Sequence, residues 1–249
     1  MRGRYILSSR LRRGMFYLTR DQLFCLFIIL PIFVISIFVQ IRMMLIYSKF
    51  KKIRNKNGVS GAVVARNILD SYGLQYVRVE MIEGTLSDHF DPTSNVVRLS
   101  RANYEGTTIA AVGIAAHEVG HAIQHAKEYK PIKVRSVAVR TSRFGSFLSM
   151  PLILVGMIFS IPKLAYLGVI LFSLIVFFEL VTLFVEFDAS SRAVKIINSQ
   201  KILEENEVVF VKKVLWAAAM TYVVSFISAL AQLVRLILLV SSLGKNDND

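Results

Sequence analysis

The sequence predicts a mainly helical integral membrane protein, with about four transmembrane helices and a small α+β domain at the membrane surface. Hydrophobic residues fill 54% of the 249 positions, charged residues fill 19%, and the mean hydropathy is +0.53. Soluble domains carry about 25% charged residues, so an ordinary soluble globule is excluded. Apolar tracts of about 18 residues or more predict membrane spans, and four such tracts occur, at residues 23–47, 144–161, 164–185 and 214–240.

The net charge of +13 would suggest nucleic acid as the partner of a soluble protein. Here the basic residues flank apolar tracts and no nucleic-acid-binding module is present, so the expected partner is the lipid bilayer, with no nucleic acid. The single cysteine, Cys25, lies inside an apolar tract, which excludes a disulfide framework and a cysteine zinc site. Any metal site must therefore use histidines and carboxylates.

The chain divides by composition into seven segments. They are a basic N-terminal tail (1–21), a transmembrane segment (22–47), a catalytic domain (48–143), a transmembrane hairpin (144–185), a helical segment (186–213), a last transmembrane segment (214–240) and a polar tail (241–249). The Arg-rich first 20 residues and the long apolar tract after them favour a retained anchor over a cleaved signal peptide, because no small-residue cleavage site follows.

Flanking charge predicts the orientation. The basic runs at residues 49–56 and 127–143 place the domain on the cytoplasmic side, whereas the Arg-rich N-terminus favours the opposite orientation. A re-entrant first segment would remove this conflict.

Within the domain, Ser60 is a predicted N-cap for a helix that buries Val63, Val64, Ile68 and Leu69 and ends at Gly73. Residues 76–83 and 95–100 alternate as strands do, and residues 84–92 are rich in turn formers. We expect the strand at 95–100 to be a sheet edge that binds an extended substrate by strand addition. A second, Ala-rich helix is predicted at residues 107–126.

That second helix carries the pattern HExxH, as His117, Glu118 and His121. Residues at i and i+4 lie on one helix face, so both imidazoles can reach a single Zn²⁺. Glu118 is then placed to act as general base on a zinc-activated water. The helix is otherwise apolar, and a metal would satisfy polar side chains that are costly to bury there.

A catalytic zinc usually takes a third protein ligand. We predict Glu186 for this role, with Glu179 and Asp188 as alternatives; Glu179 lies inside apolar sequence, where a carboxylate is costly. His125 is one turn further along the HExxH helix, too far along the axis to join both histidines easily. It is a candidate for supporting the ligands, and the alternative is a merely polar side chain. His89, in a turn, is a candidate for binding substrate or stabilising a transition state.

Five segments together resemble the YugP-type family of bacterial membrane zinc metallopeptidases. They are KIRNKNGVSGAVVARNILD, GTLSDHFDPTSNVVRLS, AAVGIAAHEVGHAIQHA, ELVTLFVEFDASSRA and VLWAAAMTY, between residues 48 and 240. The segment at Glu186 also resembles the Glu-x-x-Ala-Asp pattern of HtpX-type and CAAX-prenyl proteases, except that Ser190 replaces the Asp. A carboxylate that would hydrogen-bond a ligand histidine is then absent or supplied elsewhere, for example by Asp188.

The resemblance implies a zinc-dependent integral-membrane peptidase of the bacterial plasma membrane. It implies one catalytic Zn²⁺, His117 and His121 as ligands, and Glu118 as catalytic residue. With Glu186 the set is that of a gluzincin-like metalloendopeptidase, whose substrate is a polypeptide such as a membrane or misfolded protein. The alternatives are an intramembrane-cleaving protease and a non-catalytic, metal-stabilised scaffold or quality-control adaptor.

Overall fold

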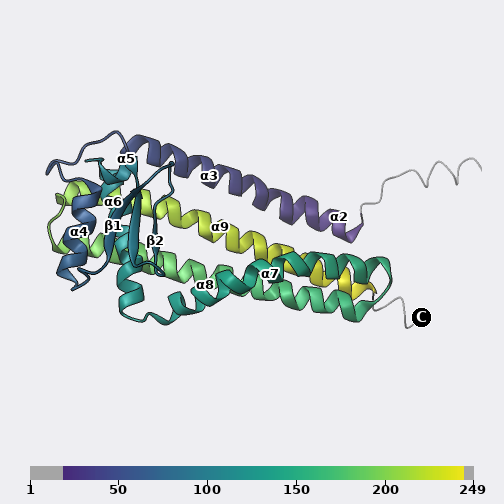
Figure 1. The fold of residues 1–249 in the computed structure, drawn as a ribbon. Helices are drawn as coiled ribbons and strands as arrows, with labels where there is room; N and C mark the ends of the chain where they lie inside the picture. Colours follow the sequence, from purple (N-terminus) through teal and green to yellow (C-terminus); the bar gives the residue numbers. More distant parts are fainter. Residues whose placement is uncertain (1–18, 244–249) are drawn as a thin grey trace, which may run out of the picture.

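The computed structural model describes residues 19–243, apart from the side chains of residues 20, 136–146 and 243. Most of the predicted Arg-rich tail and the end of the polar C-terminal tail lie outside this range. Figure 1 shows long helices side by side, with a compact unit of short helices and a small sheet at one end. At the other end lie the start of the first helix, the turn between α7 (Lys130–Ile158) and α8 (Pro162–Ser199), and the end of α9 (Glu205–Leu243).

The N-terminal anchor is one continuous helix made of α2 (Arg20–Phe24), η2 (Cys25–Ile29) and α3 (Leu30–Phe50). The π-helical η2 ends two residues before Pro31, whose ring would clash with the carbonyl four residues earlier in a regular α-helix. The wider turn accommodates the proline without ending the helix. The first segment is therefore not re-entrant, and the conflict in flanking charge is not resolved in that way.

Three of the described helices are long and apolar enough to cross a membrane: Asp21–Phe50, Pro162–Ser199 and Glu205–Ser242. They lie in α2–α3, in α8 (Pro162–Ser199) and in α9 (Glu205–Leu243). The fourth predicted tract lies in α7 (Lys130–Ile158), where the apolar stretch is limited to Phe147–Ile158. That stretch is about 18 Å long, whereas the hydrocarbon core is about 30 Å thick.

Helices α7 and α8 form the predicted hairpin and approach each other closely at two glycines. A Cβ on Gly156 would lie 2.5 Å from the backbone nitrogen of Ala165, and one on Gly168 would lie 2.7 Å from the carbonyl oxygen of Ser149. Only glycine permits this backbone separation. The close contact buries Ile153 against α8 and holds the hairpin together.

The domain begins with α4 (Gly61–Ser71), capped as predicted by Ser60, whose hydroxyl accepts a hydrogen bond from the Val63 backbone. Gly73 follows the helix with a left-handed φ of +74°. The prediction that Val63 is buried is wrong: it is 47% exposed, while Val64, Ile68 and Leu69 form the buried face. Val63 falls in the first turn, beyond the edge of the stripe that packs on α6 (Ile109–Ala126).

The sheet has three strands: β1 (Arg78–Ile82), β2 (His89–Asp91) and β3 (Val96–Ser100), in the order β1-β3-β2. β3 pairs in parallel with β1 and antiparallel with β2. The prediction that this strand is a sheet edge is therefore wrong. Its partner β2 forms within the segment that the turn formers had assigned to loop, and it takes up the side that an added substrate strand would need.

Helix α6 is the centre of the domain core. Thr108 caps it by accepting a hydrogen bond from the Ala111 backbone, and nearly every residue along it is buried. Its small side chains allow α4, α8 and α9 to pack around it in one hydrophobic cluster. A helix enclosed on several sides fixes the position of any polar side chain that it carries.

Candidate metal centre

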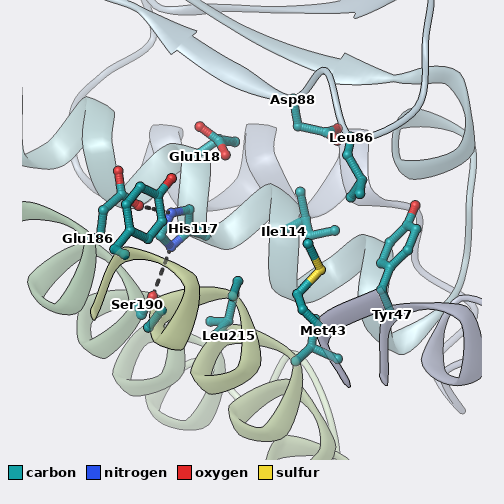
Figure 2. Close-up of a pocket in the computed structure, with 14 residues that line it drawn as sticks. Met43, Tyr47, Leu86, Asp88, Ile114, His117, Glu118, Glu186, Ser190 and Leu215 are labelled. Carbon is teal, nitrogen blue, oxygen red and sulfur yellow. Dashed lines mark hydrogen bonds and ion pairs between the residues drawn. The ribbon is translucent and has the colours of Figure 1, made fainter. Parts of the chain in front are cut away.

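His117 and His121 lie one turn apart on α6, as the HExxH spacing predicts. Their ring centroids are 4.7 Å apart, with an angle of 82° between the ring planes. Glu186 of α8 faces both rings: its Oε2 lies 3.2 Å from Nε2 of His117 and 3.7 Å from Nε2 of His121. One ligand atom from each residue lies within 4.8 Å of the others. Figure 2 shows Glu186 beside His117.

Each histidine is oriented through its other ring nitrogen. Nδ1 of His117 lies 3.1 Å from the Ser190 hydroxyl, and Nδ1 of His121 lies 3.0 Å from Oε1 of Gln124. Oε1 of Gln124 can only accept a hydrogen bond, so Nδ1 of His121 carries the proton and donates it. Nε2 of His121 then keeps a lone pair directed at Glu186. The Ser190 hydroxyl can either donate to or accept from Nδ1 of His117, so it orients this ring in either tautomer.

Asp188 acts on this site through Gln124. The Gln124 amide nitrogen donates to the Val185 carbonyl (2.9 Å) and to the Asp188 carboxylate (2.7 Å), which fixes the orientation of the amide. The Asp188 carboxylate also pairs with Arg192. Asp188 is therefore outside the histidine–glutamate cluster and does not make the direct hydrogen bond to a ligand histidine that the sequence had suggested; Gln124 lies between Asp188 and His121.

No pattern in the sequence indicates that Arg135 belongs to the site. This residue of α7 lies in the basic stretch assigned to membrane flanking charge, yet its Nη1 lies 2.8 Å from Oε1 of Glu186. The Glu186 side chain is only 4% exposed, and a buried carboxylate needs a charged or hydrogen-bonding partner. Arg135 holds one carboxylate oxygen and leaves the other facing the histidines. A contact between residues 51 positions apart leaves no local pattern to detect.

Glu118 lines a cavity of about 190 Å³ together with His117 and Glu186. Burial raises the pKa of Glu118 to about 7, despite the opposing effect of nearby His117. A carboxyl group with such a pKa can both take up and release a proton near neutral pH. In Figure 2 Glu118 lies on α6 above the His117–Glu186 pair, and Asp88 and Leu86 extend from the loop before β2.

The rest of the cavity wall is mostly apolar and comes from membrane helices as well as from the domain. Met43 and Tyr47 belong to α3, and Ala218 and Tyr222 belong to α9. Tyr47 is also packed with Phe50, Ala110 and Val214 in a cluster that joins α3, α6 and α9. The cavity thus lies where the membrane helices meet the domain.

Three other candidates are not brought to the cluster. His125 is exposed and packs on Phe90, with the ring centroids 5.8 Å apart. His89 lies on β2, with Nδ1 2.8 Å from the Ser87 carbonyl and Nε2 directed towards Arg98. Glu179 lines a separate cavity between α3, α8 and α9. Among the described residues, the grouping of metal-ligating side chains consists of His117, His121 and Glu186.

The donor chemistry of this grouping fits zinc. Two imidazole Nε2 atoms and one carboxylate oxygen form the His₂Glu set of catalytic zinc sites, which leave a fourth position open. Each donor is already oriented by a hydrogen bond or ion pair of its own, as zinc ligands usually are. The cavity of about 190 Å³ adjoins His117 and Glu186 of this donor set.

Gly120 sets the distance between the two helices that supply the donors. A Cβ at this position would lie 2.9 Å from the carbonyl oxygen of Ala189 on α8. We expect Gly120→Val to push α8 away and to weaken zinc binding by about 10- to 100-fold, the range seen when groups supporting a ligand are removed. Competition with a zinc-binding dye measures the affinity. Ala126→Val, at an exposed position of the same helix, is the control; equal affinities for Gly120→Val and wild type would contradict this interpretation.

Comparisons with known proteins agree with this chemistry. Residues 25–241 match the family described as "Putative neutral zinc metallopeptidase". The chain is 43% identical over 214 residues to a Bacillus subtilis (strain 168) protein named "Putative membrane protease YugP", which covers 86% of this chain and 95% of that protein. No solved structure gives a significant match. With its membrane helices and its His₂Glu cluster, the chain belongs to this family of membrane zinc metallopeptidases.

Proposed function

We propose that the chain is a membrane-anchored, zinc-dependent endopeptidase of the gluzincin type, with one catalytic Zn²⁺ held by His117, His121 and Glu186. One observation carries the proposal: two Nε2 atoms from α6 and one carboxylate oxygen from α8 converge beside a buried glutamate and a cavity. The family and the relative's name support peptidase activity.

When bound, zinc supplies a Lewis acid that polarises the scissile carbonyl and lowers the pKa of water. Glu118 accepts the proton from the attacking water and later delivers it to the amine nitrogen of the leaving group. Ser190 and Gln124 hold the two histidines with Nε2 directed at Glu186. Arg135 fixes the Glu186 carboxylate in the orientation that directs one oxygen towards the histidines.

The substrate is a polypeptide. The apolar part of the cavity suits an apolar side chain of the substrate next to the scissile bond. β2 is the sheet edge on the side of α6, and its Phe90 backbone N–H interacts with Glu118. An extended peptide would therefore lie near β2, and not along β3, which is paired on both sides.

We place the domain on the cytoplasmic face of the bacterial plasma membrane. Lysines cluster where α3 reaches the domain, at Lys49, Lys51 and Lys52, whereas the turn at the far end of the α7–α8 hairpin carries Lys163 alone. An excess of Lys and Arg next to membrane spans marks the cytoplasmic side. Cysteine labelling of Lys51→Cys in a Cys25→Ser background, before and after cell permeabilisation, would test the orientation.

Cleavage close to the membrane is a second candidate that one observation favours. Met43, Tyr47, Ala218 and Tyr222 line the cavity from helices that are candidate membrane spans. A substrate emerging from the bilayer could thus reach the site directly. Cleavage of a soluble unfolded peptide by the detergent-purified protein supports the first candidate, and cleavage restricted to transmembrane peptides supports the second.

Metal removal provides the test of the proposal as a whole. We expect a chelator to abolish hydrolysis of an unfolded fluorogenic peptide, and we expect added Zn²⁺ to restore it. Without the metal, nothing at the site polarises the scissile carbonyl or lowers the pKa of the attacking water. His121→Ala should lose both zinc and activity. His125→Ala is a matched control, since it removes the same side chain one turn further along α6, where it is exposed. Full activity in metal-free protein would refute the proposal.

A further inference from the structure

A groove separate from the metal centre lies between α3 and α9, near the ends of these helices that meet the domain. Its volume is about 290 Å³. Its walls are largely apolar, and its lining includes three cations: Arg42 and Lys49 of α3 and Lys213 of α9. None of the described residues that line it is Asp or Glu. The groove therefore combines an apolar channel with uncompensated positive charge.

The two lysines lie against a pair of aromatic rings. Phe50 of α3 and Phe210 of α9 stack with centroids 5.2 Å apart. Lys49 Nζ lies 5.7 Å from the Phe50 centroid, and Lys213 Nζ lies 5.5 Å from the Phe210 centroid. The stack thus presents one ammonium group from each helix at the end of the groove near the domain.

None of the three cations takes part in the ion pairs formed among the described residues. Arg42 lies seven residues before Lys49, inside the candidate span Asp21–Phe50, which places it about 10 Å further along the helix. A guanidinium at that depth is costly unless an anionic or polar group meets it. A membrane component that brings negative charge to this depth would satisfy it.

The level of the groove matches the boundary between lipid head groups and acyl chains. Lys213 comes directly before the apolar tract that begins at residue 214, and Lys49 is in the last turn of the anchor helix. Trp216, 55% exposed, lines the same groove one turn further along α9. Basic residues followed by an indole are typical of helix ends at a membrane interface.

We propose that this groove binds one anionic phospholipid. Its phosphate lies among Arg42, Lys49 and Lys213, and one acyl chain follows the apolar wall along α3. Charge decides the choice of occupant: three cations without a carboxylate favour an anionic head group over a zwitterionic one. The proposal concerns binding alone and does not depend on the peptidase reaction.

Trp216 is the single tryptophan of the chain, so its fluorescence reports on this groove. The test uses the full chain in phosphatidylcholine vesicles that contain increasing fractions of brominated phosphatidylglycerol or brominated phosphatidylcholine, because bromine quenches indole fluorescence on contact. We expect quenching to saturate at a lower fraction of the anionic lipid. We expect Arg42→Gln combined with Lys213→Gln to weaken this preference by about 30-fold, since each basic residue at a membrane surface contributes about fivefold.

Lys195→Gln is the matched control. Lys195 lines a second groove, between α8 and α9, that Trp216 also borders. Its replacement should leave the preference for anionic lipid unchanged. A loss equal to that of the double variant would place the lipid in that other groove and overturn the proposal.

Two further outcomes would also overturn it. One is equal quenching by both lipids, which indicates nonselective acyl contact. The other is the absence of quenching by either, which indicates that a second copy of the chain fills the groove. If the double variant fails to fold, a salt titration of the wild-type protein still tests the proposal: the preference must fall as ionic strength rises, and a preference independent of salt would refute it.

Discussion

Glu118→Gln is expected to lower peptide hydrolysis by about 10³-fold while zinc stays bound. Gln keeps the size of the side chain but cannot take a proton from water, and general base catalysis contributes roughly 10²- to 10⁴-fold. Glu118 is not in the ligand cluster, so the donor set of His117, His121 and Glu186 stays complete. Hydrolysis of a fluorogenic peptide gives the rate, and metal analysis of the same preparation gives the zinc content.

Glu105→Gln provides the matched control, because Glu105 is an exposed glutamate in the short turn before α6. It should hydrolyse the peptide at the wild-type rate. The comparison also separates a peptidase from a non-catalytic scaffold: if Glu118→Gln kept both its zinc and the full biological activity of the wild type, the scaffold alternative would be favoured and the assigned role of Glu118 would be wrong.

Glu186→Ala is expected to weaken zinc binding by more than about 100-fold and to abolish activity. The loss should exceed the 10- to 100-fold typical of groups that merely support a ligand. The substitution removes one of the three donors, and it also leaves the Arg135 guanidinium without its carboxylate partner. A protein with an unpaired, partly buried guanidinium should be less stable as well. Dye competition measures zinc affinity, and thermal unfolding in detergent measures stability.

Two variants on the same helix sharpen this test. Glu179→Ala removes the rival carboxylate seven residues earlier and should retain zinc, because Glu179 lines a different cavity. Asp188→Asn should weaken binding by about 10- to 100-fold, since it acts on His121 only through Gln124. If Glu179→Ala lost zinc and Glu186→Ala retained it, the assignment of the third ligand would have to be reversed.

The features that the sequence predicted well are local ones. Helix periodicity and capping residues indicated α4 and α6, and the i, i+4 spacing placed His117 and His121 on one face before any tertiary contact was known. Glu186 required more, because it lies 69 residues from His117. Its selection came from zinc chemistry and from resemblance to other metallopeptidases, and the structure brings its carboxylate to both rings.

The features that were missed depend on contacts between distant segments. β2 is three residues long and lies among turn formers, so no alternation could reveal it, and its absence from the prediction made β3 an edge strand in error. Ser190, Gln124 and Arg135 support the cluster from three helices. Each has an ordinary explanation in its local sequence, and only the packing of α6, α7 and α8 gives it a role at the site.

The three side chains proposed to bind zinc are divided between two kinds of element. His117 and His121 lie in the domain, whereas Glu186 is carried by α8, which runs without interruption from Pro162 in the hairpin to Ser199. A soluble fragment such as residues 48–143 would contain the HExxH motif and yet lack the third donor. Proteolytic release from the bilayer would therefore inactivate this enzyme, and an active excised form would have to retain the hairpin.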